Sequence, residues 1–247
     1  MSSEVRVIPL EGIPEVEDGD DLAGLVLAAA GGAGGFEDAD VLVVAQKVVS
    51  KAEGRTVRLD DVEPSALALE LADDRDPRHV EWILRESAHV VRVRPPLIIA
   101  ETRHGFVCAS AGVDASNAKG DDTLILLPLD PDASAGRLRQ AIRERAGRDV
   151  GVIVSDSFGR PFRQGTTDVA LGVAGLTSLL DLRGVRDRQG YELHATQIAV
   201  ADELAGAAEL VMGKVRGVPA ALIRGLDLRG DGTGADIPIP EERDLFR

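Results

Sequence analysis

Three polar segments of the chain carry residue types that can bind phosphate or a divalent cation. The first covers residues 112–117, where Asp114 and Asn117 offer the hard oxygen ligands that Mg²⁺ or Mn²⁺ prefers. Asp, Ser and Asn are also the residues of ordinary turns, so this segment alone leaves a plain turn open. Its meaning therefore depends on the other two segments.

The second segment, residues 152–163, gives a clearer signal. A run of Val and Ile leads directly into Asp156, which has a serine on either side. An acid at the end of a buried strand is costly unless it is paired or bound to a metal ion, and strand ends are where mixed α/β sheets bind ligands. Arg160 and Arg163 follow at once and could meet phosphate or carboxylate oxygens. Together the two acidic segments predict a site that shares one or two divalent ions between phosphate oxygens. A structural cap, with Arg160 as surface partner of Asp156, is the alternative.

The third segment contains two of the chain's few lysines. Only four of the 28 basic residues are Lys, and an ammonium group is not interchangeable with a guanidinium at a phosphate or acyl group. We expect the strand of residues 40–49 to persist through Lys47 and Lys51, which would then point to one face and reach triphosphate oxygens. Two solvated lysines on an edge strand are the alternative.

Composition narrows the class of protein that could use these segments. The 247 residues carry a net charge of −14, which disfavours binding to nucleic acid or to anionic membrane surfaces. No apolar run approaches the roughly 20 residues of a membrane span, and the N-terminus lacks a signal peptide's regions. The single Cys108 excludes an internal disulfide and is expected in the core, and the four His have no metal-ligand spacing. We therefore expect a cytoplasmic, metal-dependent enzyme.

The elements that must position these segments mix helices and strands. The glycine-rich residues 31–35 end a helix rather than open one, so they do not form a phosphate-binding loop. Asp202 and Glu203 are expected on a solvated helix face, and residues 169–180 show no clear pattern. Since strands and helices do not alternate strictly, we predict an α+β fold. Apolar runs predict strands over residues 5–10, 40–49, 90–100, 105–109, 123–127, 150–154 and 218–223, and helical spacing predicts helices over 20–30, 64–72, 78–89, 137–145 and 196–212.

Taken together, these segments resemble the coenzyme F420-0:gamma-glutamyl ligase family. Each matching string alone would be weak, but their order over nearly the whole chain makes chance agreement very improbable. The strings are Pro-Leu-Glu-Gly-Ile-Pro (9–14), Asp-Val-Leu-Val-Val (40–44), Val-Ser-Lys-Ala-Glu-Gly-Arg (49–55), Ala-Gly-Val-Asp-Ala-Ser-Asn (111–117), Leu-Pro-Leu-Asp-Pro-Asp (127–132), Ser-Asp-Ser-Phe-Gly-Arg-Pro-Phe-Arg (155–163), Val-Ala-Asp-Glu-Leu-Ala (200–205) and Leu-Val-Met-Gly-Lys (210–214).

The resemblance implies a family-specific ligase fold of mixed sheets with packed helices. It implies one unit over residues 1–247, which two intertwined subdomains could build, and a homodimer. It also implies GTP as co-substrate, two divalent cations (Mg²⁺ or Mn²⁺), and successive addition of L-glutamate to coenzyme F420-0. The matching motifs place the nucleotide against Glu11, Gly12, Ile13, Pro14, Gln46, Lys47, Lys51, Asn117, Met212, Gly213, Lys214 and Val215, the metals on Asp114, Asp156 and Ser157, and catalysis on Arg160 and Lys51.

The expected mechanism activates a carboxylate by phosphorylation. The terminal carboxylate of the substrate attacks the gamma-phosphate to form an acyl phosphate, and the amine of glutamate then displaces phosphate, while metals and cations neutralise the crowded negative charge. A metal-dependent phosphatase or phosphotransferase, and a non-catalytic nucleotide-binding subunit, are the alternatives. Some family members continue into a flavin-binding, nitroreductase-like domain, so the sequence alone fits a stand-alone ligase or a fragment.

Overall fold

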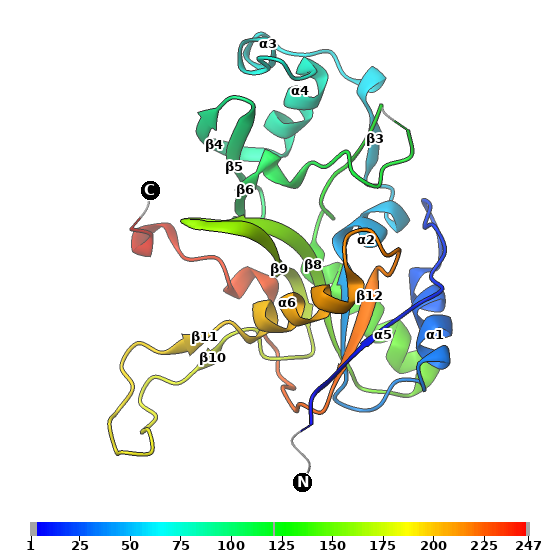
Figure 1. Cartoon of the computed structure of the whole chain (residues 1–247), viewed down its shortest axis with the longest axis vertical. Helices are drawn as coiled ribbons and strands as arrows, with labels where there is room; N and C mark the ends of the chain where they lie inside the picture. The colour runs from blue at the N-terminus through cyan, green and yellow to red at the C-terminus, as the bar shows by residue number, and fades with distance from the viewer. Residues whose placement is uncertain (1–3, 121, 246–247) are drawn as a thin grey trace.

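A mixed five-stranded sheet forms the centre of the molecule. The computed structural model describes residues 4–120 and 122–245 (Figure 1). Strands β2 and β8 run parallel, whereas the other neighbouring pairs of this sheet are antiparallel. The strand order is β1-β12-β2-β8-β9, with β1 (Arg6–Pro9), β2 (Val41–Ala45), β8 (Gly151–Arg160), β9 (Arg163–Ala174) and β12 (Ala220–Arg224).

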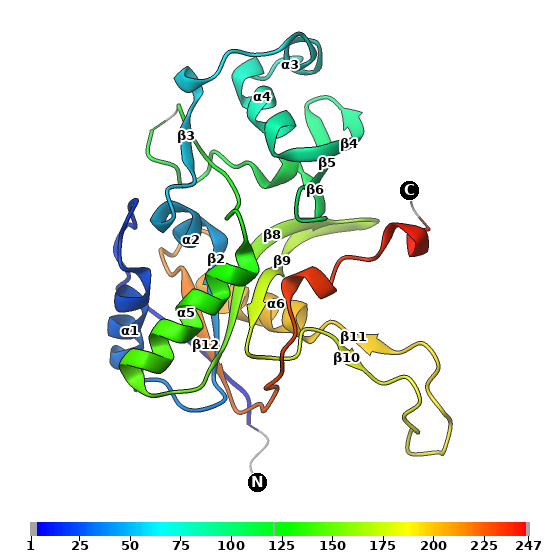
Figure 2. The ribbon, with the colours of Figure 1, turned by 180° about the vertical axis from the view of Figure 1, so that it is seen from behind.

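Helices cover both faces of this sheet (Figures 1 and 2). Along β2, Leu42 and Val44 belong to the core on one face, and Val41 and Val43 to the core on the other. Successive side chains of a strand point to opposite faces, so a strand covered on both sides is apolar throughout. Helices α1 (Leu22–Gly32), α2 (Gln46–Ala52) and α5 (Pro131–Ala146) pack on the first face, and α6 (Val200–Met212) packs on the second.

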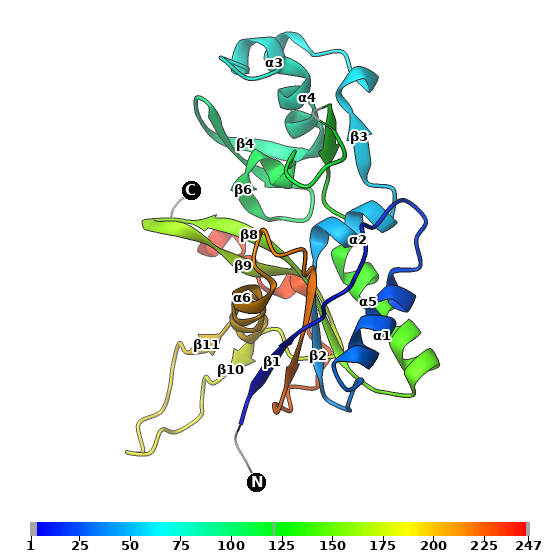
Figure 3. The same cartoon turned by 45° about the vertical axis from the view of Figure 1, so that its right-hand side comes forward.

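Residues 53–127 build a second part with its own core above the sheet (Figure 3). Val80 and Ile83 of its longer helix pack with Ile98 and Leu124 from two different ladders. One ladder pairs β3 with β7, and the other has the order β4-β5-β6. The elements are β3 (Thr56–Arg58), α3 (Ala66–Leu71), α4 (Pro77–Glu86), β4 (Ser87–Arg94), β5 (Leu97–Thr102), β6 (Val107–Ala109) and β7 (Thr123–Ile125). The suggestion of two intertwined subdomains stays a prediction.

A long arm leaves the body between the sheet and α6. Its base is a two-stranded ladder of β10 (Leu180–Asp181) and β11 (Gln197–Ile198), and the arm extends away from the molecule in Figures 1 to 3. Among residues 4–120 and 122–245, no helix combines the length and the apolar character needed to cross a membrane.

The α+β prediction is confirmed. Asp130 caps α5 by accepting a 2.9 Å hydrogen bond from the amide of Ala133. Cys108 is buried. The glycines after α1 end that helix, as expected.

Several element predictions were wrong. Residues 46–52 form helix α2 instead of extending β2, so Lys47 and Lys51 share a helix face one turn apart. The run 90–100 divides into β4 and β5 at Pro95 and Pro96, which have no N–H to donate to a ladder.

The later part of the chain holds further differences. Strand β8 continues to Arg160, and residues 163–174, which showed no clear pattern at their end, form β9 as its hairpin partner. Helix α6 begins only at Val200, because β11 precedes it. Asp202 was expected in solvent, but it is half-buried and accepts a 2.9 Å hydrogen bond from the amide of Ala170.

Candidate functional site

A cavity of about 460 Å³ opens where the parallel strands β2 and β8 leave their shared ladder. This is the carboxyl edge of the parallel pair, the usual place for a ligand in such sheets. Segments far apart in the sequence line it: residues 13–16 after β1, the first turns of α2, Asn117, residues 155–157 of β8, Asp168 of β9, and the end of α6 with the turn that follows.

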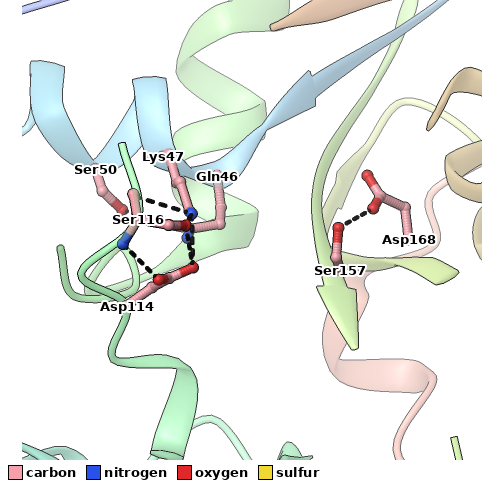
Figure 4. Close-up of polar contacts among 7 residues, drawn as sticks. All are labelled: Gln46, Lys47, Ser50, Asp114, Ser116, Ser157 and Asp168. Atoms are coloured by element: carbon pink, nitrogen blue, oxygen red, sulfur yellow. Dashed lines mark hydrogen bonds and ion pairs between the residues drawn. The ribbon is translucent and has the colours of Figure 1, made fainter. Parts of the chain in front are cut away.

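One wall of the cavity carries cations. Lys47 and Lys51 line the cavity from α2 and Lys214 lines it from the turn after α6, which accounts for three of the four lysines in the sequence. Lys47 Nζ donates to Asp114 Oδ2 at 2.6 Å and to the carbonyl oxygen of Ser116 at 3.1 Å (Figure 4). Lys51 forms an ion pair with Glu15. The ammonium groups of Lys47 and Lys51 are therefore held by partners that an anionic ligand could replace.

Asp114 is neutralised by this wall. Burial raises the pKa of its carboxyl, but hydrogen bonds from Lys47 and Ser116 outweigh burial, so its pKa lies below the ordinary value. The amide of Ser116 donates to Asp114 Oδ1 at 2.7 Å, which fixes the carboxylate in a tight turn. The segment therefore forms a turn, and the carboxylate of Asp114 in that turn also forms an ion pair with Lys47.

The opposite wall, formed by β8 and β9, carries acids that form no ion pair with any residue that the structure describes. Burial raises the pKa of Asp156 to about 7; the amide of Ser157 and the charge of Lys47 pull it down, and the carboxylates of Asp114 and Asp168 push it up again. In the part of the chain that the structure describes, no cation forms an ion pair with Asp156. Asp114 is near enough to affect Asp156, so the two predicted acidic segments do converge.

The residues present fit a divalent cation that brings phosphate oxygens with it. Within the described ranges, no group of three or more His, Cys, Asp or Glu is placed to hold a metal ion by protein ligands of those types alone. Mg²⁺ is commonly held by one or two carboxylates together with substrate phosphates. Asp156, which lacks a counter-ion, and the hydroxyl of Ser157 match that donor set, and Asp114 could join them by releasing Lys47.

The cavity gathers nearly all of the residues that the sequence predicted. Every predicted nucleotide residue except Glu11 and Gly12 lines it, as do Asp156 and Ser157. Asp114 lies behind the wall, bonded to Lys47. Arg160 lies outside, at the end of β8 beside the hairpin turn, where it is exposed and donates to the carbonyl oxygen of Gln164 at 2.8 Å. The roles of these residues, including catalysis by Arg160 and Lys51, stay predictions.

Sequence reasoning missed several polar residues of the site. Asp168 and Glu209 line the cavity, and Ser50 lies directly behind it. Asp168 could have been found by treating residues 163–174 as the hairpin partner of β8, because the register places it opposite Ser157. Ser50 donates to Gln46 Oε1 at 2.9 Å, and Gln46 Nε2 has no hydrogen-bond partner among the described residues.

The segments that build this cavity also match known proteins. The family model described as F420-0:Gamma-glutamyl ligase matches residues 12–225, a range that includes all of the cavity's lining. This chain belongs to that family. The resemblance seen in the sequence is therefore confirmed.

Relatives in the family match almost from end to end. The chain is 47% identical to the coenzyme F420:L-glutamate ligase of Methanothermobacter thermautotrophicus, over 98% of this chain and 99% of that protein. It is 48% identical to the protein of the same name from Methanopyrus kandleri, over 98% and 97%. The corresponding protein of Methanocaldococcus jannaschii is 46% identical over 86% of both chains. Family membership thus covers the site as well as the fold.

Proposed function

We propose that this chain is a GTP-dependent ligase that joins L-glutamate to coenzyme F420-0 and then adds further gamma-linked glutamates. The names of the family and of its relatives support the substrates. The observation that carries the proposal is the cavity's pair of walls, with lysines on one side and, on the other, acids that no cation among the described residues pairs with. Such a pair suits a polyanion that arrives with cations.

The lysine wall is the proposed site of the triphosphate. A protein with a net charge of −14 repels anions in general, so phosphate binding needs a local concentration of positive charge. Lys47 and Lys51 share a face of α2, and Lys214 comes from the turn after α6, so the three ammonium groups approach one ligand from two directions. Phosphate oxygens would compete with Asp114 for Lys47 and with Glu15 for Lys51.

The β8–β9 wall is the proposed site of the metal ions. Asp156, Ser157 and Asp114 would hold two divalent cations, Mg²⁺ or Mn²⁺, together with phosphate oxygens of the nucleotide. When bound, such ions neutralise charge on the phosphates and make them more electrophilic. The raised pKa of Asp156 fits this role, because a cation beside the carboxylate would restore its ionised form.

The proposed reaction runs in two displacements. A carboxylate oxygen of the acceptor attacks the gamma-phosphorus of GTP, the bond to the bridging oxygen breaks, and GDP leaves an acyl phosphate behind. The uncharged amine of glutamate then attacks the acyl carbon; phosphate leaves, and the nitrogen loses a proton. Lys51, which lines the cavity, would offset charge that develops on the transferred phosphoryl group. A homodimer, which the resemblance implies, belongs to the same proposal.

One assay tests the proposed function directly. The purified protein is incubated with F420-0, L-glutamate, GTP and Mn²⁺, and the products are analysed by mass spectrometry and nucleotide chromatography. We expect mass increments of one glutamate residue, with GDP released only when both acceptor and glutamate are present. GDP release without acceptor would favour a phosphatase instead, and nucleotide binding without turnover would favour a non-catalytic subunit.

A further inference from the structure

Asp168 is a buried acid that the proposed function has not yet used. It lies on β9 directly opposite Ser157 in the hairpin register, lines the cavity, and is 5% exposed. Its two oxygens divide between two hydroxyls: Ser157 Oγ donates to Oδ1 at 2.6 Å, and Ser155 Oγ donates to Oδ2 at 3.0 Å (Figure 4 shows the first). The described residues supply no cation that pairs with it.

These hydrogen bonds fix the direction of the Ser157 hydroxyl. A hydroxyl group has one hydrogen and two lone pairs, whereas an ionised carboxylate can only accept. The hydrogen of Ser157 therefore points at Asp168, and its lone pairs point elsewhere. Ser155, which is 1% exposed, binds the other carboxylate oxygen and prevents Asp168 from turning away. The result is a hydroxyl oxygen that is oriented before any ligand arrives.

We propose that Asp168 is a positioning residue that holds the Ser157 hydroxyl ready to coordinate a divalent cation beside Asp156. A neutral hydroxyl is a good ligand only when its hydrogen faces away from the ion, and outer-shell acceptors enforce that orientation. Asp168 acts through Ser157 and does not itself touch the ion. The inference rests on the proposed cation site, and it adds a residue and a reason to that site.

The test measures nucleotide affinity with and without the metal. Isothermal titration gives the Kd for GDP in Mn²⁺ and in EDTA, and the ratio of the two reports what the cation adds. Asp168→Ala and Ser157→Ala should each weaken binding in Mn²⁺ by about tenfold or more, the usual cost of losing a ligand or its outer-shell partner, with little change in EDTA. The double variant should bind GDP in Mn²⁺ no more weakly than the single variant with the larger loss, because both substitutions remove the same interaction.

Two further variants separate positioning from charge. Asp168→Asn keeps a carbonyl oxygen that can accept from Ser157, so it should retain most of the affinity that Asp168→Ala loses. Asp202→Asn is the matched control: it also removes a carboxylate that binds β9, through the amide of Ala170, but it does not line the cavity. It should leave the Kd in Mn²⁺ unchanged. Melting temperatures in EDTA verify that each variant is folded.

The outcomes that overturn the inference are distinct. If the losses in the double variant add, or if Asp168→Asn loses as much as Asp168→Ala, Asp168 acts by its charge or as a direct ligand and not through Ser157. If the unchanged protein binds GDP equally well in Mn²⁺ and in EDTA, the proposed cation site itself fails, and the inference fails with it.

Discussion

The two walls of the cavity place the same residue type in opposite electrostatic conditions. Asp114, on the α2 side, is bonded to Lys47 and has a pKa below its ordinary value. Asp156, on the β8–β9 side, has no cation partner in the described part of the chain, and burial raises its pKa to about 7. Both are half-buried, and burial raises the pKa of both, but only Asp114 has an ion-pair partner within the described ranges and hydrogen bonds that outweigh burial. The wall without one has room for a cation supplied by a ligand.

The largest expected effect comes from removing the acid that lacks a counter-charge. Asp156→Asn should lower turnover by roughly a hundredfold or more, because a direct ligand matters at least as much as an outer-shell partner. Asp114→Asn should also lower it, in part by releasing Lys47. Steady-state kinetics at saturating GTP measure both. Turnover that is unchanged in Asp156→Asn would mean that the β8–β9 wall does not hold a cation that the reaction needs.

Stability against pH should separate the same two acids by sign. The pKa of Asp156 in the folded protein, about 7, lies above the value of 3.8 for an unperturbed Asp, so the folded state binds this proton more tightly than the unfolded state. Ionisation then costs stability as the pH rises from about 4 to 7, and the full cost remains above pH 7. In EDTA at pH 8, Asp156→Asn should therefore be more stable than the parent, by an amount on the order of a few kcal/mol.

Asp114 should behave in the opposite way. Its folded pKa is lowered, so it contributes stability that is present above the unfolded pKa and is lost as the pH falls through the folded pKa. Asp114→Asn should be less stable than the parent at pH 8, and the difference should disappear in acid. Urea unfolding in EDTA provides the measurement, at pH 8 and pH 4 for Asp156→Asn and at pH 8 and about pH 2 for Asp114→Asn, because the folded pKa of Asp114 lies below 3.8. If both variants changed the free energy of unfolding at pH 8 in the same direction, the two walls would not differ in their electrostatics as proposed.

Without the ion pair between Lys47 and Asp114, the acid of the α2 wall should have a raised pKa, as Asp156 has on the β8–β9 wall. Lys47→Met keeps the length of the side chain but removes the charge that holds Asp114, so the pKa of Asp114 should rise. Loss of one charge-assisted contact to phosphate should weaken GDP binding by about tenfold, corresponding to about 1.5 kcal/mol. Titration calorimetry gives the affinity, and NMR of the Asp114 carboxyl gives its titration. An unchanged affinity would place the phosphates away from α2.

The sequence identified the polar residues at the strand end, but not the whole site. Asp156 was predictable, because an acid directly after a run of buried Val and Ile needs a partner. Asp168 was not, because the exposed first half of β9 has a polar pattern that also suits a loop. Its importance appears only from the hairpin register, which places it opposite Ser157. Pairing between strands is a non-local property, and one segment's composition does not determine it.

The end of β2 shows a second limit. Residues 46–52 contain Val48 and Val49 among polar residues, a pattern too short to distinguish a helix from a continuing strand. Tertiary packing decides it: Val49 is buried against the core on the α1 and α5 face, and Gln46 is buried where it lines the cavity. The prediction that Lys47 and Lys51 face one side held for a different geometric reason, since residues four apart share a helix face as well.

The smallest expected effect concerns a hydrogen bond behind the lysine wall. Ser50 is fully buried and donates to Gln46 Oε1, which turns the amide so that Nε2, a donor without a partner among the described residues, is left for a ligand at the cavity. Ser50→Ala removes that constraint and should raise the KM for GTP severalfold, equivalent to about 1 kcal/mol, with little change in kcat. Ser50→Thr, which keeps the hydroxyl, is the matched control.

The metal ion used in the assay provides a second check. Because Gln46 belongs to the lysine wall and not to the acidic one, the rise in KM should be the same with Mg²⁺ and with Mn²⁺. A rise that depends on the metal would instead mean that Gln46 acts at the cation site.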